Sequence, residues 1–116
     1  MRICASVGRA ADTGGMETIV TFRNGFDASL LPEGFNGYAD VGEGPLPDTG
    51  IRIISSHHDF EGTPSSADIV GRLSRMGSDI AKGAYSVRDF RDLANILTAS
   101  ESLEREHVLL GMGPLG

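Results

Sequence analysis

The sequence predicts an α/β fold in which parallel strands are joined by helical crossovers. Two observations carry this prediction: short apolar runs recur along the 116 residues, and helical patterns separate the last three of these runs. Each run is bounded by Gly, Pro, Asp or Asn, which is typical of strands. The expected strands are residues 3–7, 18–22, 38–41, 51–55, 80–84 and 107–111.

Two amphipathic helices are expected in the second half of the chain. After strand 51–55, the segment Thr63-Pro64-Ser65-Ser66 supplies an N-cap and a proline for the first turn, and apolar residues recur at helical spacing up to Gly77. After strand 80–84, Ser86 is expected to cap a second helix. The apolar face of this second helix is expected to comprise Val87, Phe90, Leu93, Ala94 and Leu97. This order of elements predicts parallel strands with right-handed crossovers.

The first half of the chain lacks such helices. Only residues 27–31 have the composition for a short helical turn, and residues 42–50 form a loop rich in Gly and Pro. A parallel crossover normally needs a dozen or more residues, so these connections are abbreviated. The chain is therefore predicted to be a single domain over residues 1–116, with abbreviated strands and loops in 1–50 and a regular βαβαβ segment in 51–116.

Composition excludes several classes of partner. The net charge of −6 and the pI near 4.9 argue against binding to nucleic acid or to an acidic membrane surface, because no basic cluster exists to neutralise phosphates. The single cysteine, Cys4, cannot form an internal disulfide. With no signal-like leader and no apolar stretch of membrane-spanning length, we expect a cytoplasmic protein.

The most reactive side chains stand on two neighbouring expected strands. Lys82 is the only lysine and lies in an apolar run, where burial disfavours the charged amine and lowers its pKa. Such an amine becomes a nucleophile toward carbonyl groups. His57 and His58 follow the preceding strand, so an amine and an imidazole meet at neighbouring strand ends, as Schiff-base chemistry with proton transfer requires. The alternative is that Lys82 passes the strand end and reaches solvent.

Three further polar or polarisable residues belong to the same predicted rim. Ser6, Arg23 and Met112 lie within or at the ends of other strands, and functional groups in α/β barrels collect at the carboxyl ends of the strands. A metal site is not predicted. The adjacent residues His57 and His58 point to opposite faces of a strand, and no Cys/His spacing matches a zinc site.

At this point the residues resemble those of the type I 3-dehydroquinate dehydratases. The segment from Ser56 to Pro64 is similar to that family's Ser-x-His-Asp-Phe-x-x-Thr-Pro motif, and the segment from Asp79 to Ala84 is similar to its Asp-Ile-x-Lys-x-Ala segment. Weaker similarities to the family are found in Ile3-Cys4-Ala5-Ser6-Val7, Thr21-Phe22-Arg23, Tyr38-Ala39-Asp40-Val41 and the last strand, His107 through Gly116.

The resemblance implies a fold and a reaction. The family's fold is an eight-stranded (β/α) barrel of TIM type, and the reaction removes water from 3-dehydroquinate to give 3-dehydroshikimate in aromatic amino-acid biosynthesis. Lys82 would form the Schiff base and His58 would act as general acid and base. Ser6, Arg23 and Met112 would contact the substrate, and no cofactor would be needed.

The chain also departs from the family pattern. No segment matches the family's Glu-x-Arg, and its Asp-x-Glu reads Asp40-Val41-Gly42, with Glu43 one place late. The sequence stops at Gly116, before the family's substrate-clamping arginine. A complete barrel takes roughly 200–250 residues, so we expect an incomplete barrel with uncovered strand edges that favour self-association. The alternative function is a catalytically inactive remnant that acts at most as an interaction module.

Overall fold

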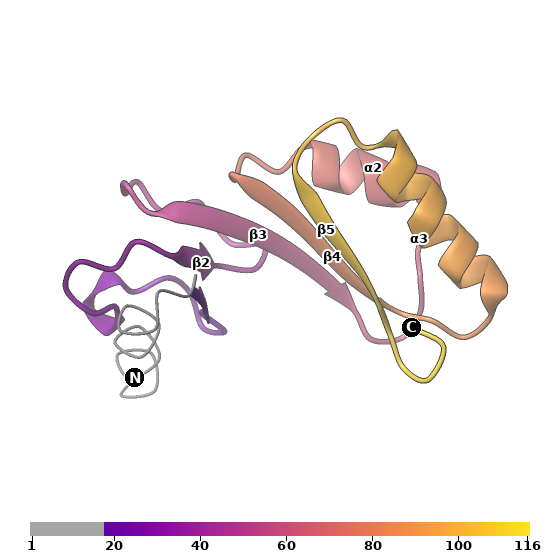
Figure 1. The fold of residues 1–116 in the computed structure, drawn as a ribbon, viewed down its shortest axis with the longest axis horizontal. Coiled ribbons are helices and arrows are strands. Elements are labelled where there is room, and N and C mark those ends of the chain that lie inside the picture. The colour runs from indigo at the N-terminus through magenta and orange to yellow at the C-terminus, as the bar shows by residue number, and fades with distance from the viewer. Residues whose placement is uncertain (1–17) are drawn as a thin grey trace.

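Five parallel strands form one sheet in the order in which they occur along the chain (Figure 1). The computed structural model describes residues 18–116, so the expected strand 3–7 and its Ser6 lie outside the described residues. The elements are β1 (Ile19–Thr21), the 3-10 turn η1 (Ala28–Leu30), β2 (Tyr38–Asp40), β3 (Arg52–Asp59), α2 (Ser66–Ser74), β4 (Ile80–Ser86), α3 (Phe90–Ser102) and β5 (His107–Met112). The predicted fold class is confirmed: the sheet is parallel, its later strands are joined by helices, and it does not close.

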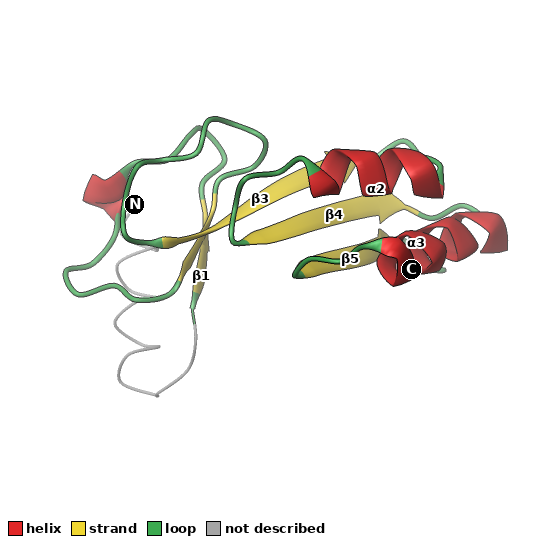
Figure 2. Cartoon of the chain, turned by 90° about the horizontal axis from the view of Figure 1, so that it is seen from above, coloured by secondary structure: helices red, strands yellow, loops and turns green. Residues whose placement is uncertain are grey.

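The long strand β3 connects the two halves of the sheet. Its first three residues, 52–54, pair with β2, whereas residues 54–59 pair with β4. The helices lie beside β3, β4 and β5 only, and the abbreviated strands β1 and β2 lie at the other end of the molecule (Figures 1 and 2). Among the described residues no helix is long and apolar enough to cross a membrane.

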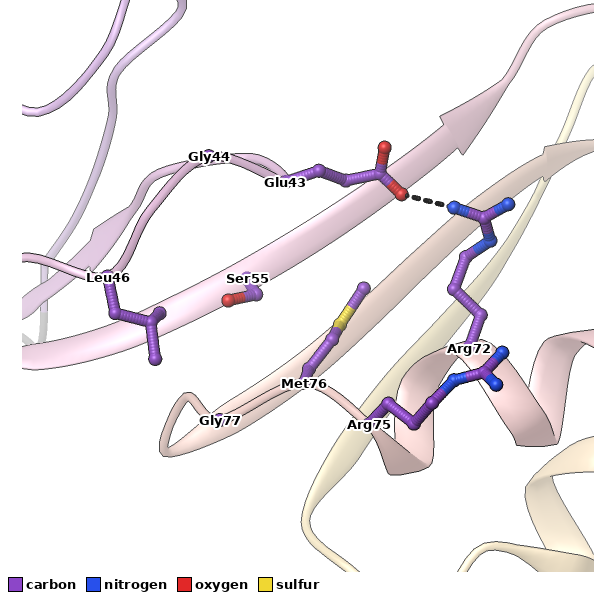
Figure 3. Close-up of a pocket in the computed structure, with 8 residues that line it drawn as sticks. All are labelled: Glu43, Gly44, Leu46, Ser55, Arg72, Arg75, Met76 and Gly77. Carbon is purple, nitrogen blue, oxygen red and sulfur yellow. Dashed lines mark hydrogen bonds and ion pairs between the residues drawn. The ribbon is translucent and has the colours of Figure 1, made fainter.

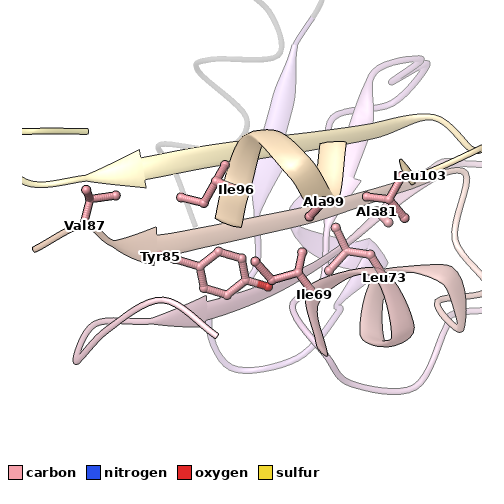
Figure 4. Close-up of a cluster of buried hydrophobic side chains, with 8 residues drawn as sticks. All are labelled: Ile69, Leu73, Ala81, Tyr85, Val87, Ile96, Ala99 and Leu103. Carbon is pink, nitrogen blue, oxygen red and sulfur yellow. The ribbon is translucent and has the colours of Figure 1, made fainter. Parts of the chain in front are cut away.

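Side-chain alternation along the strands builds the core between the sheet and its helices. Ala81 and Tyr85 of β4 point to the helices, where Tyr85 is fully buried against Ile69 of α2 and Ile96 of α3 (Figure 4). A second apolar cluster under β1 and β2 contains Val20, Phe22, Ala39, Val41 and Ile53. The helices therefore cover one face of the sheet, and the other face of β3–β5 is left uncovered by them.

The predicted segment 63–66 supplies the N-cap of α2, although Pro64 precedes the cap and is not in the first turn. Ser65 is the N-cap of α2, and its hydroxyl accepts the backbone N–H of Asp68. The prediction that Ser86 caps α3 is wrong: β4 continues through Ser86, whose hydroxyl donates to the carbonyl of Phe60, and Asp89 caps the helix. Aspartate is as good an N-cap as serine, so composition alone did not decide between them.

The expected apolar face of α3 is only partly right: Val87 and Leu93 belong to the core, but Phe90, Ala94 and Leu97 do not. The side chains buried against the sheet and α2 are Ile96 and Ala99, whereas Phe90 and Leu97 are 78% and 65% exposed. Phe90, Leu93 and Leu97 have the same helical spacing as Leu93, Ile96 and Ser100, so the periodicity does not distinguish the two faces. Which face of α3 is buried depends on the elements that pack against the helix. Among residues 18–116, no element covers Phe90 and Leu97.

Candidate active site

The register of β3 and β4 determines which polar residues share a face. Ser56 pairs with Lys82, and His58 pairs with Ala84 two residues further along. Paired residues on neighbouring strands point to the same side, and alternate residues along a strand share a face. His58 and Lys82 therefore lie on the face that the helices leave uncovered, while His57 points to the opposite face.

Three of the five predicted site residues line one groove on this face. The groove has a volume of about 740 Å³, and Arg23, His58 and Lys82 contribute to its walls together with Asp40 and Ser56. Met112 pairs with Ser86 beyond the groove and is not among the lining residues. Ser6 lies outside the described residues. Arg23, two residues after β1, thus borders the same space as groups from β2, β3 and β4.

A buried carboxylate holds the amine of Lys82. Its Nζ lies 3.3 Å from Oδ2 of Asp40, whose side chain is 1% exposed. The other oxygen of this carboxylate accepts the Ser56 hydroxyl at 2.7 Å and the Gly42 backbone N–H at 3.1 Å. All the polar partners of Asp40 are thus donors, as a buried carboxylate requires.

Lys82 is the third residue of β4, as expected from the strand predicted over residues 80–84, and its side chain is 26% exposed. The structure adds a carboxylate partner, Asp40, that the sequence did not point to. Asp40 was not predicted as a site residue, although a lone aspartate within an apolar strand is a signal for a buried polar contact.

His58 and Phe60 both line the groove. The ring of His58 is stacked on that of Phe60, with ring centroids 5.9 Å apart and an interplanar angle of 6°. Within residues 18–116 the guanidinium of Arg23 makes no ion pair, so it is available to an anionic ligand in the groove. The described residues contain no group of three or more His, Cys, Asp or Glu side chains placed to hold a metal.

A second cavity of about 390 Å³ lies on the opposite side of the sheet, between α2 and the loop that follows β2 (Figure 3). Glu43 and Gly44 border both this cavity and the groove. The carboxylate of Glu43 pairs with Arg72 of α2 at 2.8 Å. Gly42, with φ of +68°, occupies the position of the glutamate in the family pattern Asp-x-Glu. Asp40 occupies the position of the aspartate and is the carboxylate that contacts Lys82.

His57 lies on the side of the sheet that carries this second cavity, and it does not line the groove. Its Nδ1 lies 3.0 Å from the hydroxyl of Tyr85, and its Nε2 lies 3.9 Å from Glu43. Desolvation, followed by the charge of Arg72, lowers the pKa of His57, and burial raises the pKa of Tyr85 to about 12. A neutral imidazole accepts the phenol hydrogen at Nδ1 in the tautomer that carries its own proton on Nε2, the nitrogen that lies toward Glu43.

Comparison with known proteins identifies relatives of this arrangement. A sequence model of the family described as Type I 3-dehydroquinase matches residues 46–116. The 3-dehydroquinate dehydratase of Lactiplantibacillus plantarum is 38% identical over 73 residues, which are 57% of this chain and 29% of that protein. The enzyme of the same name from Alkaliphilus oremlandii is 33% identical over 75 residues, 58% of this chain and 29% of that protein. The match thus spans under a third of the length of these curated relatives.

Solved structures show the same fold over nearly the whole chain. The 3-dehydroquinate dehydratase of Enterococcus faecalis has a TM-score of 0.75 at 24% identity, over 99% of this chain and 63% of that one. The structure from Geobacillus kaustophilus has a TM-score of 0.71 at 18% identity, over 99% and 58%. The five-stranded open sheet therefore corresponds to part of a TIM barrel, and the chain belongs to the type I 3-dehydroquinase family.

Proposed function

We propose that this chain is a 3-dehydroquinate dehydratase-like lyase in which Lys82 forms a Schiff base with the ketone of 3-dehydroquinate. The observation that carries the proposal is the shared groove: Lys82, His58 and Arg23 line one open cavity on one face of the sheet. An amine, an imidazole and a guanidinium around a space of this size suit a small anionic ketone.

The chemistry assigns one role to each group. The amine of Lys82 adds to the substrate carbonyl, and loss of water leaves an iminium that acidifies the neighbouring C–H bond. His58 removes that proton and then returns a proton to the departing β-hydroxyl, which leaves as water. Hydrolysis of the remaining imine releases the product and restores the amine.

Two further residues support these steps. Asp40 lies 3.3 Å from Nζ of Lys82, so it can accept the proton that the ammonium must lose before it attacks. Arg23 makes no ion pair within residues 18–116 and would bind the substrate carboxylate. Ser6 and Met112 are proposed as substrate contacts on the family resemblance alone.

Borohydride trapping tests the proposal directly. The full chain is incubated with 3-dehydroquinate and sodium borohydride, and peptides are mapped by mass spectrometry; we expect a stable adduct on Lys82. Lys82→Arg is the matched control, because it keeps the positive charge beside Asp40 but cannot form an imine. His58→Gln should still give the adduct while losing turnover.

Two observations favour a second candidate function, a catalytically inactive remnant. Among residues 18–116, Arg23 is the only arginine that lines the groove, and Gly42 stands where the family has a glutamate. If the folded chain forms no adduct at substrate concentrations that label a full-length relative, the proposed chemistry is wrong and the remnant is favoured.

A further inference from the structure

We propose that the second cavity, on the helix side of the sheet, binds a small hydroxylated carboxylate, with a carboxylate group at one end, an apolar body and a hydroxyl group at the other end. The cavity has a volume of about 390 Å³ and lies between α2 and the loop that follows β2 (Figure 3). The groove that contains Lys82 is on the other side of the sheet. This inference therefore does not rest on the proposed catalysis.

The cavity exists because the connection from β2 to β3 is a loop. Parallel strands are usually joined by a helix that covers the sheet, but residues 41–51 contain no helix. Ser55 of β3 points to the helix side, because alternate residues of a strand share a face and Ser56 faces the groove. Beside α2, the space above Ser55 is bordered by Glu43, Gly44 and Leu46 of this loop.

Two arginine side chains from the C-terminal end of α2 form the anion-binding end of the cavity. Arg72 and Arg75 are three residues apart, so they lie on the same flank of the helix, and both line the cavity (Figure 3). Arg72 pairs with Glu43 at 2.8 Å, whereas Arg75 makes no ion pair within residues 18–116. Two guanidinium groups and one carboxylate leave the wall with one net positive charge. A free guanidinium favours a carboxylate, which it binds through two N–H groups.

A third guanidinium reduces the repulsion that the end of α2 would exert on an anion. The last carbonyl groups of a helix carry partial negative charge, which disfavours an anion nearby. Here Arg105 donates to the carbonyls of Leu73, Met76 and Ser78. These carbonyls are therefore neutralised from the side of Arg105, and Arg72 and Arg75 remain available to a ligand.

Ser55 supplies an unused hydroxyl group to the cavity. The residue is only 5% exposed, yet its hydroxyl makes no hydrogen bond within residues 18–116. No fully buried side-chain N or O atom of the described residues lacks a partner, so the Ser55 oxygen is in contact with the cavity (Figure 3). A hydroxyl group in such a place is satisfied only by a molecule that enters the cavity. A polar group of the ligand is therefore expected beside Ser55.

Apolar side chains lie between the two polar ends. In Figure 3, Ser55 and Leu46 are at one end of the cavity, Arg72 and Arg75 are at the other end, and Met76 is between them. A methionine side chain is flexible and makes favourable contacts with aromatic rings. Para-hydroxybenzoate has the three required parts in this order: a carboxylate for the arginines, a ring for Met76 and a hydroxyl for Ser55. Inorganic phosphate has only the first.

Titration of the full chain with para-hydroxybenzoate tests the proposal. Binding is followed by NMR through isotope-labelled methionine methyl groups, and the signal of Met76 is identified with Met76→Leu. We expect the Met76 signal to shift until the site is saturated. The signal of Met112 should not move, because Met112 is on β5 and does not line the cavity.

Three variants assign the binding to the proposed groups. Arg75→Gln should raise the dissociation constant about tenfold, and Ser55→Ala about threefold, because they remove a charge-assisted and a neutral hydrogen bond. Glu43→Gln should lower the dissociation constant about threefold, because the half-exposed Glu43 carboxylate competes with the ligand for Arg72. Arg91→Gln is the matched control, because Arg91 is exposed on α3 and does not line this cavity. Each variant should keep the circular dichroism of the parent chain.

Ligand analogues test the chemical class. Benzoate lacks the hydroxyl and para-hydroxybenzyl alcohol lacks the carboxylate, so both should bind more weakly than para-hydroxybenzoate. A Met76 signal that does not shift at millimolar ligand would overturn the proposal, as would a shift that persists with the same dissociation constant in Arg75→Gln. Displacement of para-hydroxybenzoate by an equal concentration of inorganic phosphate would also overturn it, because the apolar wall and Ser55 would then contribute nothing.

Discussion

At the scale of single residues, the contact between Asp40 and Lys82 organises the groove. Their separation in sequence is 42 residues, and the contact exists because β2 and β4 both pair with β3. The motifs around His58 and Lys82 could be found in the sequence since each is contiguous. Asp40 gives a signal for a buried polar contact, but its partners could not be identified from the sequence, because Ser56 and Lys82 are brought to it only by the register of three strands.

Replacing the Asp40 carboxylate should show how much its contact with Lys82 contributes to the stability of the folded chain. Asp40→Asn keeps an acceptor for Ser56 and Gly42 but removes the charge that pairs with Lys82, so we expect the free energy of unfolding in urea to fall by about 1–2 kcal/mol. Glu43→Gln is the comparison, because it breaks the half-exposed pair with Arg72 and should cost about 0.5 kcal/mol or less. Equal losses in the two variants would contradict the assigned role of Asp40.

At the scale of elements, the sequence predicted which segments are strands and helices but not where each helix begins. The expected strands between residues 18 and 111 all occur, and β3 extends four residues beyond its expected end. The extension places His57 and His58 within a strand, so their side chains are fixed on opposite faces. Serine and aspartate are equally good caps, and an apolar periodicity does not show which neighbour is present, so the start and face of α3 depended on tertiary structure.

The cap of α3 gives a test at this scale. Asp89 accepts the N–H of Asp92 at 3.1 Å, so Asp89→Ala should lower the free energy of unfolding by about 1 kcal/mol. Ser86→Ala removes only a hydroxyl that donates to the Phe60 carbonyl and should cost less. Chemical denaturation of both variants tests the assignment of Asp89 as the N-cap. A larger loss of unfolding free energy for Ser86→Ala would assign the N-cap to Ser86 instead.

At the scale of the whole molecule, the sheet is open and the chain is extended. Its radius of gyration is 15.3 Å, above the value of about 13 Å expected for a compact domain of this length. The sequence predicted the open barrel from chain length and from the short connections in its first half. The sequence did not predict the second cavity, which lies between α2 and the loop that follows β2.

The stability of the whole molecule should depend on pH through His57. Its pKa is lowered in the folded chain from 6.5, so the unfolded chain binds the proton more tightly. The stabilisation from the neutral imidazole is therefore full above pH 6.5 and is lost as pH falls through the folded pKa. Urea denaturation between pH 8 and pH 5 should show a decline that is shallower in His57→Gln. Parallel pH profiles for the two proteins would exclude this contribution.

The position of Asp40 has a consequence for charge balance during the proposed reaction. An ammonium and a protonated imine each carry one positive charge on the same nitrogen, so a carboxylate that neutralises the first also neutralises the second. Because Asp40 is held by Ser56 and Gly42 as well as by Lys82, it need not move when that nitrogen acquires a carbon substituent. The protein would then enter and leave the covalent intermediate without reorganising its buried counter-ion.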